Sequence, residues 1–261
     1  MIVGFSHLTF SCADLKPGIH RLRDLGYSRH FEEAGVENAI EKKPLLRNFH
    51  PTHDLAFLKR DGALNIELIN HHSTVDGFND DLFPVYRSDY PDEKWLDAEL
   101  NINGVTKQHL EKIEQAFGEE ARFFFDADLN LFLVWVSNKG SNAEGFIAGA
   151  ILSDSLSKAD ELIQQLRFRK NKAKHFWSFP SPFPSMSISL ILLEKNESLN
   201  GSKKVLDSPG CTCLAFLGTG EINNLSFQEQ SQTFEVCVNS SDLSVKFLYD
   251  SALPYIEVIQ K

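Results

Sequence analysis

The order of residues near the start of the chain predicts a strand followed by a helix. Polar residues alternate with apolar ones around His7 and Thr9, as they do in a strand whose side chains point to opposite faces in turn. Apolar residues at helical spacing then follow at Leu15, Ile19, Leu22 and Leu25. Asp14 can cap this helix and Gly26 can end it. Residues 145–168 repeat the order of strand and helix, so the chain contains one structural unit more than once.

The remaining pattern predicts short strands, one further helix and several loops. Strands are expected near 31–40, 54–59, 63–70 and 95–102, two more within 123–136, and three after residue 232. A helix is expected at 106–117, and a weak one between 220 and 232. Loops are expected at 79–93, 137–144, 180–184 and 196–202, which are rich in Pro, Ser, Asn and Asp. We therefore expect an α+β chain of four modules, at 1–75, 76–143, 144–204 and 205–261.

A second repeat links the two ends of the chain. Residues 60–69 are echoed by residues 249–259, and each copy is a turn followed by an apolar strand with one carboxylate inside it, Glu67 or Glu257. A carboxylate among apolar neighbours is costly to desolvate unless a cation or hydrogen-bond donors meet it. Two such strands in one chain therefore suggest a shared polar site.

The same repeat extends to the first strand of each terminal module. Residues 4–10 resemble residues 210–216, and this match places His7 at the position of Cys213. In the third module Ala148 stands at the position of His7, so no ligand is expected there. The first and last modules therefore hold the candidate chemistry, while the second and third show no obvious ligands.

These residues resemble the vicinal oxygen chelate superfamily, which includes glyoxalase I, extradiol dioxygenases and the bleomycin and fosfomycin resistance proteins. The resemblance implies β-α-β-β-β modules that pair into cupped half-barrel sheets. It also implies a divalent metal held by a residue on the first strand and a Glu or His on the last strand of each module. His7, Glu67 and Glu257 match these ligand positions, and Cys213 stands at the fourth, where His or Gln is usual. The site then requires the first module to pair with the last, and the second with the third.

The ligand set indicates the metal and the reaction class. One imidazole and two carboxylates favour Mn, Fe(II), Ni, Zn or Mg over copper, and a thiolate from Cys213 would shift the preference towards zinc or iron. The set is not a triad of two histidines and one carboxylate, so a metal-dependent lyase or isomerase is favoured over a dioxygenase. Glu67 or Glu257 could then move a proton and count as catalytic. A metal-free protein that binds or sequesters a small molecule in the same cup is the alternative, and a scaffold of packing modules is a third option.

The histidines and Cys213 suggest two further candidate functions. His50, His53, His71 and His72 form the densest histidine cluster; solvated strand ends are the favoured interpretation, and a place near the site is the alternative. Cys213 is not expected to be a nucleophile, because no His stands beside it in sequence to lower its pKa.

Composition narrows the partners. The chain has 261 residues and a formal net charge of -10 at pH 7, which argues against a nucleic-acid surface because no basic stripe neutralises phosphates. The apolar runs are of strand length, and no basic leader is seen, so we expect a cytoplasmic protein without a membrane segment. A small molecule is the expected partner, and a homodimer is an open option. The four cysteines are expected to be reduced.

Overall fold

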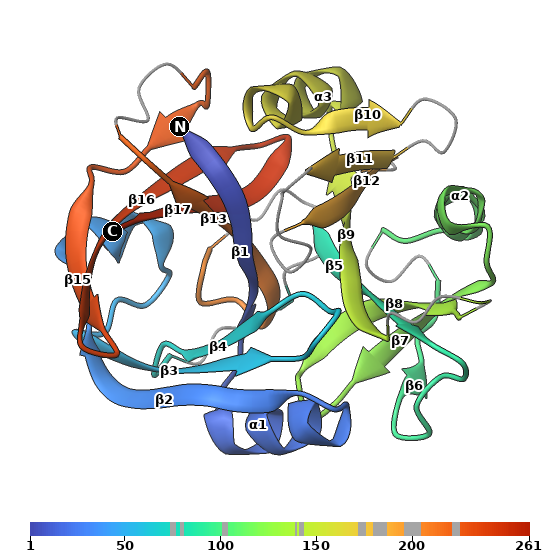
Figure 1. Cartoon of the computed structure of the whole chain (residues 1–261), viewed down its shortest axis with the longest axis horizontal. Coiled ribbons are helices and arrows are strands. Elements are labelled where there is room, and N and C mark those ends of the chain that lie inside the picture. Colours follow the sequence, from blue (N-terminus) through green and yellow to red (C-terminus); the bar gives the residue numbers. More distant parts are fainter. Residues whose placement is uncertain are drawn as a thin grey trace.

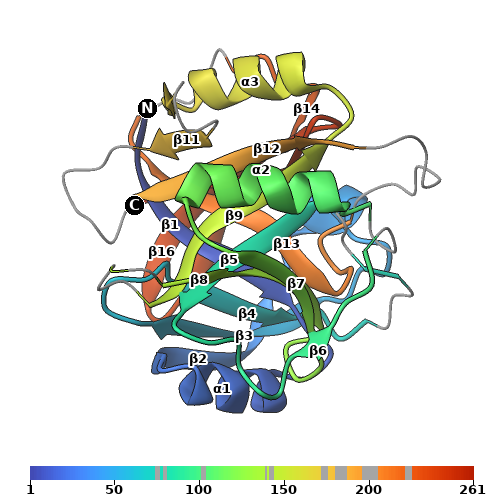
Figure 2. The ribbon, with the colours of Figure 1, turned by 90° about the vertical axis from the view of Figure 1, so that its right-hand side faces the viewer.

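The computed structural model describes residues 1–73, 77–78, 81–100, 104–138, 140, 144–171, 176–179, 187–195, 205–220 and 225–261. Two mixed β-sheets lie side by side, and the helices pack outside them (Figure 1). The view turned by 90° places α1 at one end of the molecule and α3 at the other, with α2 between them on the face turned to the viewer (Figure 2). The two sheets and few helices confirm the predicted α+β class.

The first sheet is built from both ends of the chain. Its nine strands run in the order β14-β16-β17-β13-β1-β4-β3-β2, with β15 paired to β16. The strands from the start of the chain are β1 (Ile2–Ser11), β2 (Ser28–Glu37), β3 (Thr52–Lys59) and β4 (Ile66–Asn70). Those from its end are β13 (Gly210–Gly218), β14 (Glu229–Gln230), β15 (Phe234–Val238), β16 (Ser241–Asp250) and β17 (Leu253–Gln260). The helix α1 (Leu15–Asp24) and the short 3-10 helix η1 (Ile40–Leu45) belong to this half.

The second sheet is built from the middle of the chain. Its eight strands run in the order β10-β11-β12-β9-β5-β8-β7-β6. They are β5 (Leu82–Ser88), β6 (Leu96–Asp97), β7 (Ala121–Asp126), β8 (Leu131–Ser137), β9 (Gly145–Ser153), β10 (Arg169–Asn171), β11 (Phe176–Phe179) and β12 (Ile188–Glu194). The helices α2 (Lys107–Phe117) and α3 (Leu156–Gln165) belong to this half.

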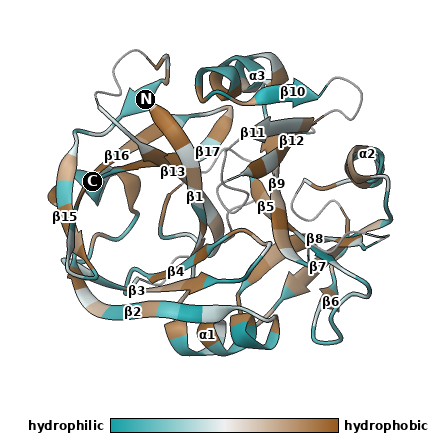
Figure 3. Cartoon of the chain, in the orientation of Figure 1, coloured by the Kyte–Doolittle hydropathy of each residue, from teal (hydrophilic) through white to brown (hydrophobic). Residues whose placement is uncertain are grey.

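Both sheets follow one plan of strand pairing. In the first, β1 and β13 form a central antiparallel pair, and each has a parallel partner on its other side, β4 and β17. In the second, β9 and β5 form the antiparallel pair, and their parallel partners are β12 and β8. The cup that holds the candidate ligands is therefore formed where residues 2–70 meet residues 210–260. Figure 3 shows β9 coloured hydrophobic along most of its length, in line with its burial.

The three main helices confirm the sequence pattern. Asp14 accepts a hydrogen bond from Lys16 N at the start of α1, and Thr106 caps α2 through His109 N. Gly118 ends α2 in the left-handed conformation at φ 72°, which glycine adopts without the strain of a side chain. Helix spacing therefore predicted these three helices correctly.

Three expectations for the elements were wrong. Residues 82–88 lie in the stretch expected as a loop but form β5, a central strand in which Pro84 is buried with its neighbours. The strand expected at 95–102 is reduced to Leu96–Asp97 among the described residues. Residues 225–232 form no helix and include the short strand β14. The expected loops at 180–184 and 196–202 lie outside the described residues.

A buried polar network joins the two halves. Arg21 on α1 is only 1% exposed, and its Nε donates to Asp126 Oδ2 on β7 at 2.6 Å. Trp95 Nε1 donates to the same oxygen at 2.7 Å. These bonds hold α1 against the second sheet. None of the described helices has the length and apolarity required to cross a membrane.

Candidate metal and ligand site

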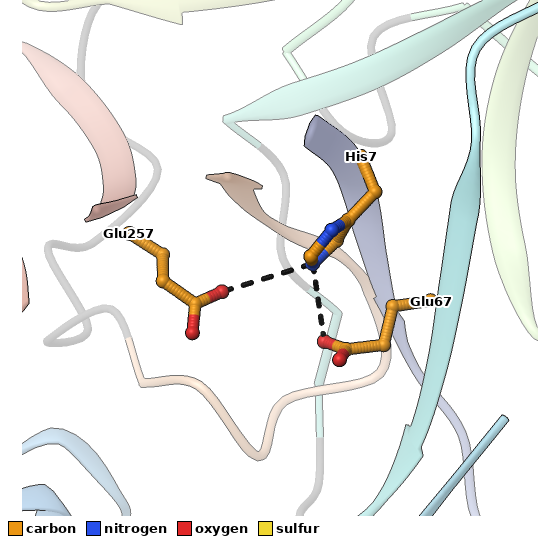
Figure 4. A group of neighbouring side chains, drawn as sticks. All are labelled: His7, Glu67 and Glu257. Atoms are coloured by element: carbon orange, nitrogen blue, oxygen red, sulfur yellow. Dashed lines mark ion pairs between the residues drawn. The ribbon is translucent and has the colours of Figure 1, made fainter. Parts of the chain in front are cut away.

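Three of the predicted site residues meet in one cavity. His7 projects from β1, Glu67 from β4 and Glu257 from β17 (Figure 4). His7 Nε2 lies 3.5 Å from Glu67 Oε2 and 3.8 Å from Glu257 Oε2. One ligand atom from each of the three residues lies within 4.8 Å of the other two. These side chains are therefore close enough to share one cation.

Strand register explains why these side chains converge. Glu67 pairs with Thr9 on β1, and Glu257 pairs with Ala215 on β13. Across the central antiparallel pair, His7 is opposite Ala215 and Thr9 is opposite Cys213. Paired residues of neighbouring strands point to the same face of a sheet. A local two-fold relation thus puts the two glutamates and His7 on the concave side of one sheet.

Cys213 occupies the position related to His7 by this two-fold relation. Its side chain lines the same cavity, but it does not belong to the group of three close ligand atoms. Burial raises the pKa of its thiol well above the usual value, and the nearby charges of Glu257 and Glu67 act in the same direction. The residue is therefore a neutral thiol at neutral pH, which agrees with the expectation that it is not a nucleophile.

Hydrogen bonds orient His7 and Glu67. Ser6 Oγ lies 2.9 Å from His7 Nδ1, and Thr9 Oγ1 donates to Glu67 Oε2 at 3.2 Å. When His7 is neutral with its proton on Nδ1, it donates that proton to Ser6, and the lone pair of Nε2 faces the carboxylates. Buried His7 Nε2 has no hydrogen-bond partner among the described residues. That atom is therefore available as a ligand.

The carboxylates and His7 shift each other's pKa. Burial lowers the pKa of His7, but Glu67 and Glu257 outweigh it and raise the pKa above its usual value. Burial alone would raise the pKa of Glu67. The charges of His7 and Lys42 outweigh burial, so the pKa falls to about 2. Burial and the charge of Glu67 raise the pKa of Glu257 to about 7. Without a metal and at a pH between about 4.5 and 6.5, Glu67 is therefore ionised beside a protonated His7, and Glu257 is mostly protonated.

Lys42 is a residue of the cavity that sequence reasoning missed. It projects from η1, is 7% exposed and lines the cavity with the two glutamates. Burial lowers the pKa of its ammonium, while Glu257 and Glu67 oppose that change. In sequence it stands beside Lys43, which is exposed, and no local pattern distinguishes the two. Only the packing of η1 over the cup reveals it.

The histidine cluster divides into two pairs. His53 and His71 are buried and line the cavity, with ring centroids 6.0 Å apart, so the favoured interpretation of solvated strand ends was wrong for them. It holds for the exposed His50 and His72. Burial and the positive charge of Lys42 lower the pKa of both His53 and His71 to about 3. Both imidazoles are therefore neutral at neutral pH.

Apolar side chains form the rest of the cavity wall. The cavity has a volume of about 240 Å³. Its apolar lining comes from both ends of the chain and includes Phe31, Leu55, Phe57, Leu206, Val245 and Phe247. Such a site suits a small molecule with an apolar body and a few polar groups.

The donor set fits a divalent metal. One imidazole with a free lone pair and two carboxylates are ligand types that Mn, Fe(II), Ni, Zn and Mg accept. The two glutamates supply two negative charges, which match the charge of a dication. The unpartnered Nε2 of His7 also gains a partner in this arrangement. Residues His7, Glu67 and Glu257 are thus suited to hold such an ion.

Comparison with known proteins identifies the fold. The sequence matches no protein-family model and no curated protein sequence. Glyoxalase I from Zea mays superposes with a TM-score of 0.54 and 10% identity, over 98% of this chain and 92% of that chain. A mutant of that glyoxalase gives a TM-score of 0.57 at 10% identity, over 98% and 93% of the two chains. A Bacillus subtilis protein provisionally named a dioxygenase gives 0.55 at 12% identity, over 99% and 85%. The chain therefore has the fold of the vicinal oxygen chelate superfamily, as the sequence motifs predicted.

Proposed function

We propose that this protein binds one divalent metal ion through His7, Glu67 and Glu257 and acts as a lyase or isomerase on a small oxygenated molecule. The main support is the meeting of three metal-ligating side chains, from three strands, inside one largely apolar cavity. The fold shared with glyoxalase I is consistent with this class of reaction. A dication held by these residues would act as a Lewis acid and stabilise negative charge that develops on substrate oxygens.

The two glutamates differ in how firmly they are held. Glu67 accepts a hydrogen bond from Thr9 and lies nearer to His7. Glu257 accepts no hydrogen bond from any residue that the structure describes, and its contact with His7 is longer, at 3.8 Å. A proton-transferring group needs freedom to reach the substrate and a pKa near the working pH. We therefore assign proton transfer to Glu257, and the more restrained ligand position to Glu67.

The set of candidate metal ligands gives less support to oxygen activation. Non-haem iron dioxygenases commonly use two histidines and one carboxylate, whereas the group here contains one histidine and two carboxylates. His53 and His71 line the same cavity but are not members of that group. A dioxygenase is therefore the less favoured enzyme.

A metal-free binding or sequestering protein is the second candidate. One observation favours it: protonated His7 can compensate the charge of Glu67 without a metal, since Nε2 and Oε2 lie 3.5 Å apart. The mainly apolar wall would then enclose an organic ligand by itself. Metal binding by the purified protein separates this candidate from the first.

The experiment measures metal content and then proton exchange. Protein purified without chelator is analysed for metals and titrated with Mn, Ni and Zn, and we expect one ion per chain. The loaded protein is then incubated in D₂O with α-hydroxycarbonyl compounds, where a lyase or isomerase that removes a carbon-bound proton introduces deuterium visible by NMR. Oxygen uptake with catechols would instead indicate a dioxygenase. A protein that binds none of these metals at micromolar concentration is the metal-free binder.

A further inference from the structure

The cavity contains a second polar group, formed by Lys42, His53 and His71, that the proposed metal site does not use. All three side chains are buried. The Nδ1 atoms of His53 and His71 have no hydrogen-bond partner among the described residues. Three nitrogens of one cavity wall are thus available to a ligand, and one of them belongs to a cationic side chain.

The surroundings of Lys42 compensate its charge only in part, because Glu257 and Glu67 act on its ammonium without a direct ion pair. Within the described part of the chain, no carboxylate lies within 4.0 Å of its ammonium. Its Nζ lies 5.8 Å from the ring centroids of Phe234 and of Phe247. Cation–π contacts offset only a small part of the free energy that it costs to remove an ion from water. A buried ammonium in this position therefore needs a further anionic partner.

The charges in the cavity define that partner. Glu67 and Glu257 together provide two negative charges, which a bound dication neutralises. His53 and His71 are neutral, because burial and Lys42 lower the pKa of each to about 3. When Lys42 is protonated, its ammonium then remains as one positive charge that no ion pair in the described part of the cavity neutralises. A single negative charge on the ligand restores neutrality in a site where water cannot screen the imbalance.

The segment that presents Lys42 is held firmly in place. Leu206 N donates to Leu45 O at 2.8 Å, and the Asp207 carboxylate accepts from Arg47 N and Asn48 N at 2.9 Å each. These bonds fasten the end of η1 to the start of the last module. A lysine on a clamped segment is preorganised for binding, whereas a mobile surface lysine would lose side-chain entropy on binding.

We propose that Lys42, with His53 and His71 beside it, binds a carboxylate of the substrate. The proposal rests on the proposed function, and it narrows the substrate to a small monocarboxylate whose apolar body separates the acid from the adjacent oxygens that face His7, Glu67 and Glu257. One ammonium matches the single charge of a carboxylate. A phosphate dianion would bring a second negative charge into a cavity that already contains two glutamates.

The test compares an acid with its neutral amide. The probes are 5-hydroxy-4-oxopentanoate, which has a hydroxyketone at one end and a carboxylate at the other, and the corresponding amide. Binding to zinc-loaded protein is measured by isothermal titration calorimetry. We expect the acid to bind at least tenfold more tightly than the amide. Equal affinity for the two probes, or no binding of either at millimolar concentration, would overturn the proposal.

Variants of Lys42 test whether this residue binds the carboxylate of the ligand. Lys42→Met keeps most of the stem and removes the charge, so the acid should lose at least tenfold in affinity while the amide changes little. Lys42→Arg should retain part of the preference for the acid. Lys43→Met is the matched control, because Lys43 lies on the same segment with its side chain exposed, and it should bind as the parent does. An equal loss for acid and amide in Lys42→Met would mean that the lysine only supports the fold.

The same samples separate this proposal from the proposed function. Zinc stoichiometry is measured for each variant, and Lys42→Met should keep one ion per chain. Metal binding without a preference for the acid would reject the carboxylate site alone. A preference for the acid that depends on Lys42, in a protein that binds no metal, would reject the metal-dependent reaction and retain the carboxylate site. Tighter binding of propyl phosphate than of pentanoate would reject the carboxylate in favour of a phosphoryl group.

Discussion

Glu67 and Glu257 occupy equivalent positions in the first sheet, although they lie near opposite ends of the chain. Each stands on a strand that runs parallel to one member of the central antiparallel pair, opposite Thr9 and Ala215 respectively. Their carboxylates approach His7 Nε2 from two sides, at 3.5 and 3.8 Å (Figure 4). The local two-fold relation of the strands therefore produces the chemical symmetry of the site, and the ligands themselves break it at His7 and Cys213.

The first prediction concerns the ligands of the metal. His7→Ala, Glu67→Gln and Glu257→Gln each remove a donor or a charge that a dication needs, so each should weaken zinc or manganese binding by at least tenfold. Cys213→Ser should change the affinity by less than threefold, because the thiol is neutral and lies outside the close group of ligand atoms. Calorimetric titration of the four variants beside the parent measures this. A strong loss in Cys213→Ser would show that the thiolate coordinates after all.

The sequence predicted the site residues that belong to a local pattern, and it missed those whose position depends on contacts between distant segments. The pattern around His7 and the two copies of an apolar strand with one glutamate are local features, and they led to three residues that the fold brings together. Lys42 lacks such a local feature, and the histidine cluster gave no sign that His53 and His71 are its buried members. Lys42 reaches the cavity through the path of η1, and His53 lies on β3 opposite Val36, beside a register shift in the pairing of β2 with β3. His71 follows directly after β4. Those are tertiary effects that residue type does not encode.

The errors in the fold have a similar cause. Residues 82–88 were expected in a loop because Pro84 and nearby Asn and Asp residues are typical of turns. The strand forms because Phe83 and Val85 are buried against β9, and this long-range pairing outweighs the local preference. The helices were easier to predict, because their caps and spacing lie within a few residues of each other.

The second prediction concerns the pH dependence of metal binding. A carboxylate must be ionised to bind a metal, and a proton competes for it below its pKa. Burial and Glu67 raise the pKa of Glu257 to about 7. Metal affinity should therefore rise as the pH increases from 6 to 8, and binding at pH 6 should release protons. Calorimetric titrations in buffers of different ionisation enthalpy measure that release. An affinity that stays constant over this range would contradict the role of Glu257.

The third prediction concerns the network between the two halves. Asp126 is buried and accepts from Arg21 and Trp95. Asp126→Ala leaves these donors without their acceptor, so it should lower the free energy of unfolding by about 3 kcal/mol. Asp97→Ala removes an ion pair with Arg122 whose members are largely exposed, and it should change stability by less than about 1 kcal/mol. Urea unfolding of both variants provides the comparison. Zinc stoichiometry should remain unchanged in the folded state of each.

The fourth prediction is that Glu257 destabilises the metal-free protein at neutral to alkaline pH. Its pKa is raised to about 7 in the folded chain, from an ordinary value of 4.5. Folding therefore favours its protonated form, so the stability present below pH 4.5 is lost as the pH rises through 7. Glu257→Gln removes the ionisable group, so metal-free Glu257→Gln should be more stable than the metal-free parent at pH 8, by on the order of 1–3 kcal/mol.

This gain should disappear at low pH or when metal is present. At pH 5 most of the Glu257 carboxyl is protonated in the folded protein, so the variant and the parent should differ by less than about 1 kcal/mol. With zinc, the parent gains binding energy that the variant lacks, and the order of stability should reverse. Glu93→Gln, at an exposed position, is the control and should match the parent at each pH. The opposite result would be a Glu257→Gln variant that is less stable than the parent at pH 8 without metal. It would show that His7 or Lys42 compensates the charge of the ionised carboxylate within the protein. The site would then not need a metal to balance its charge.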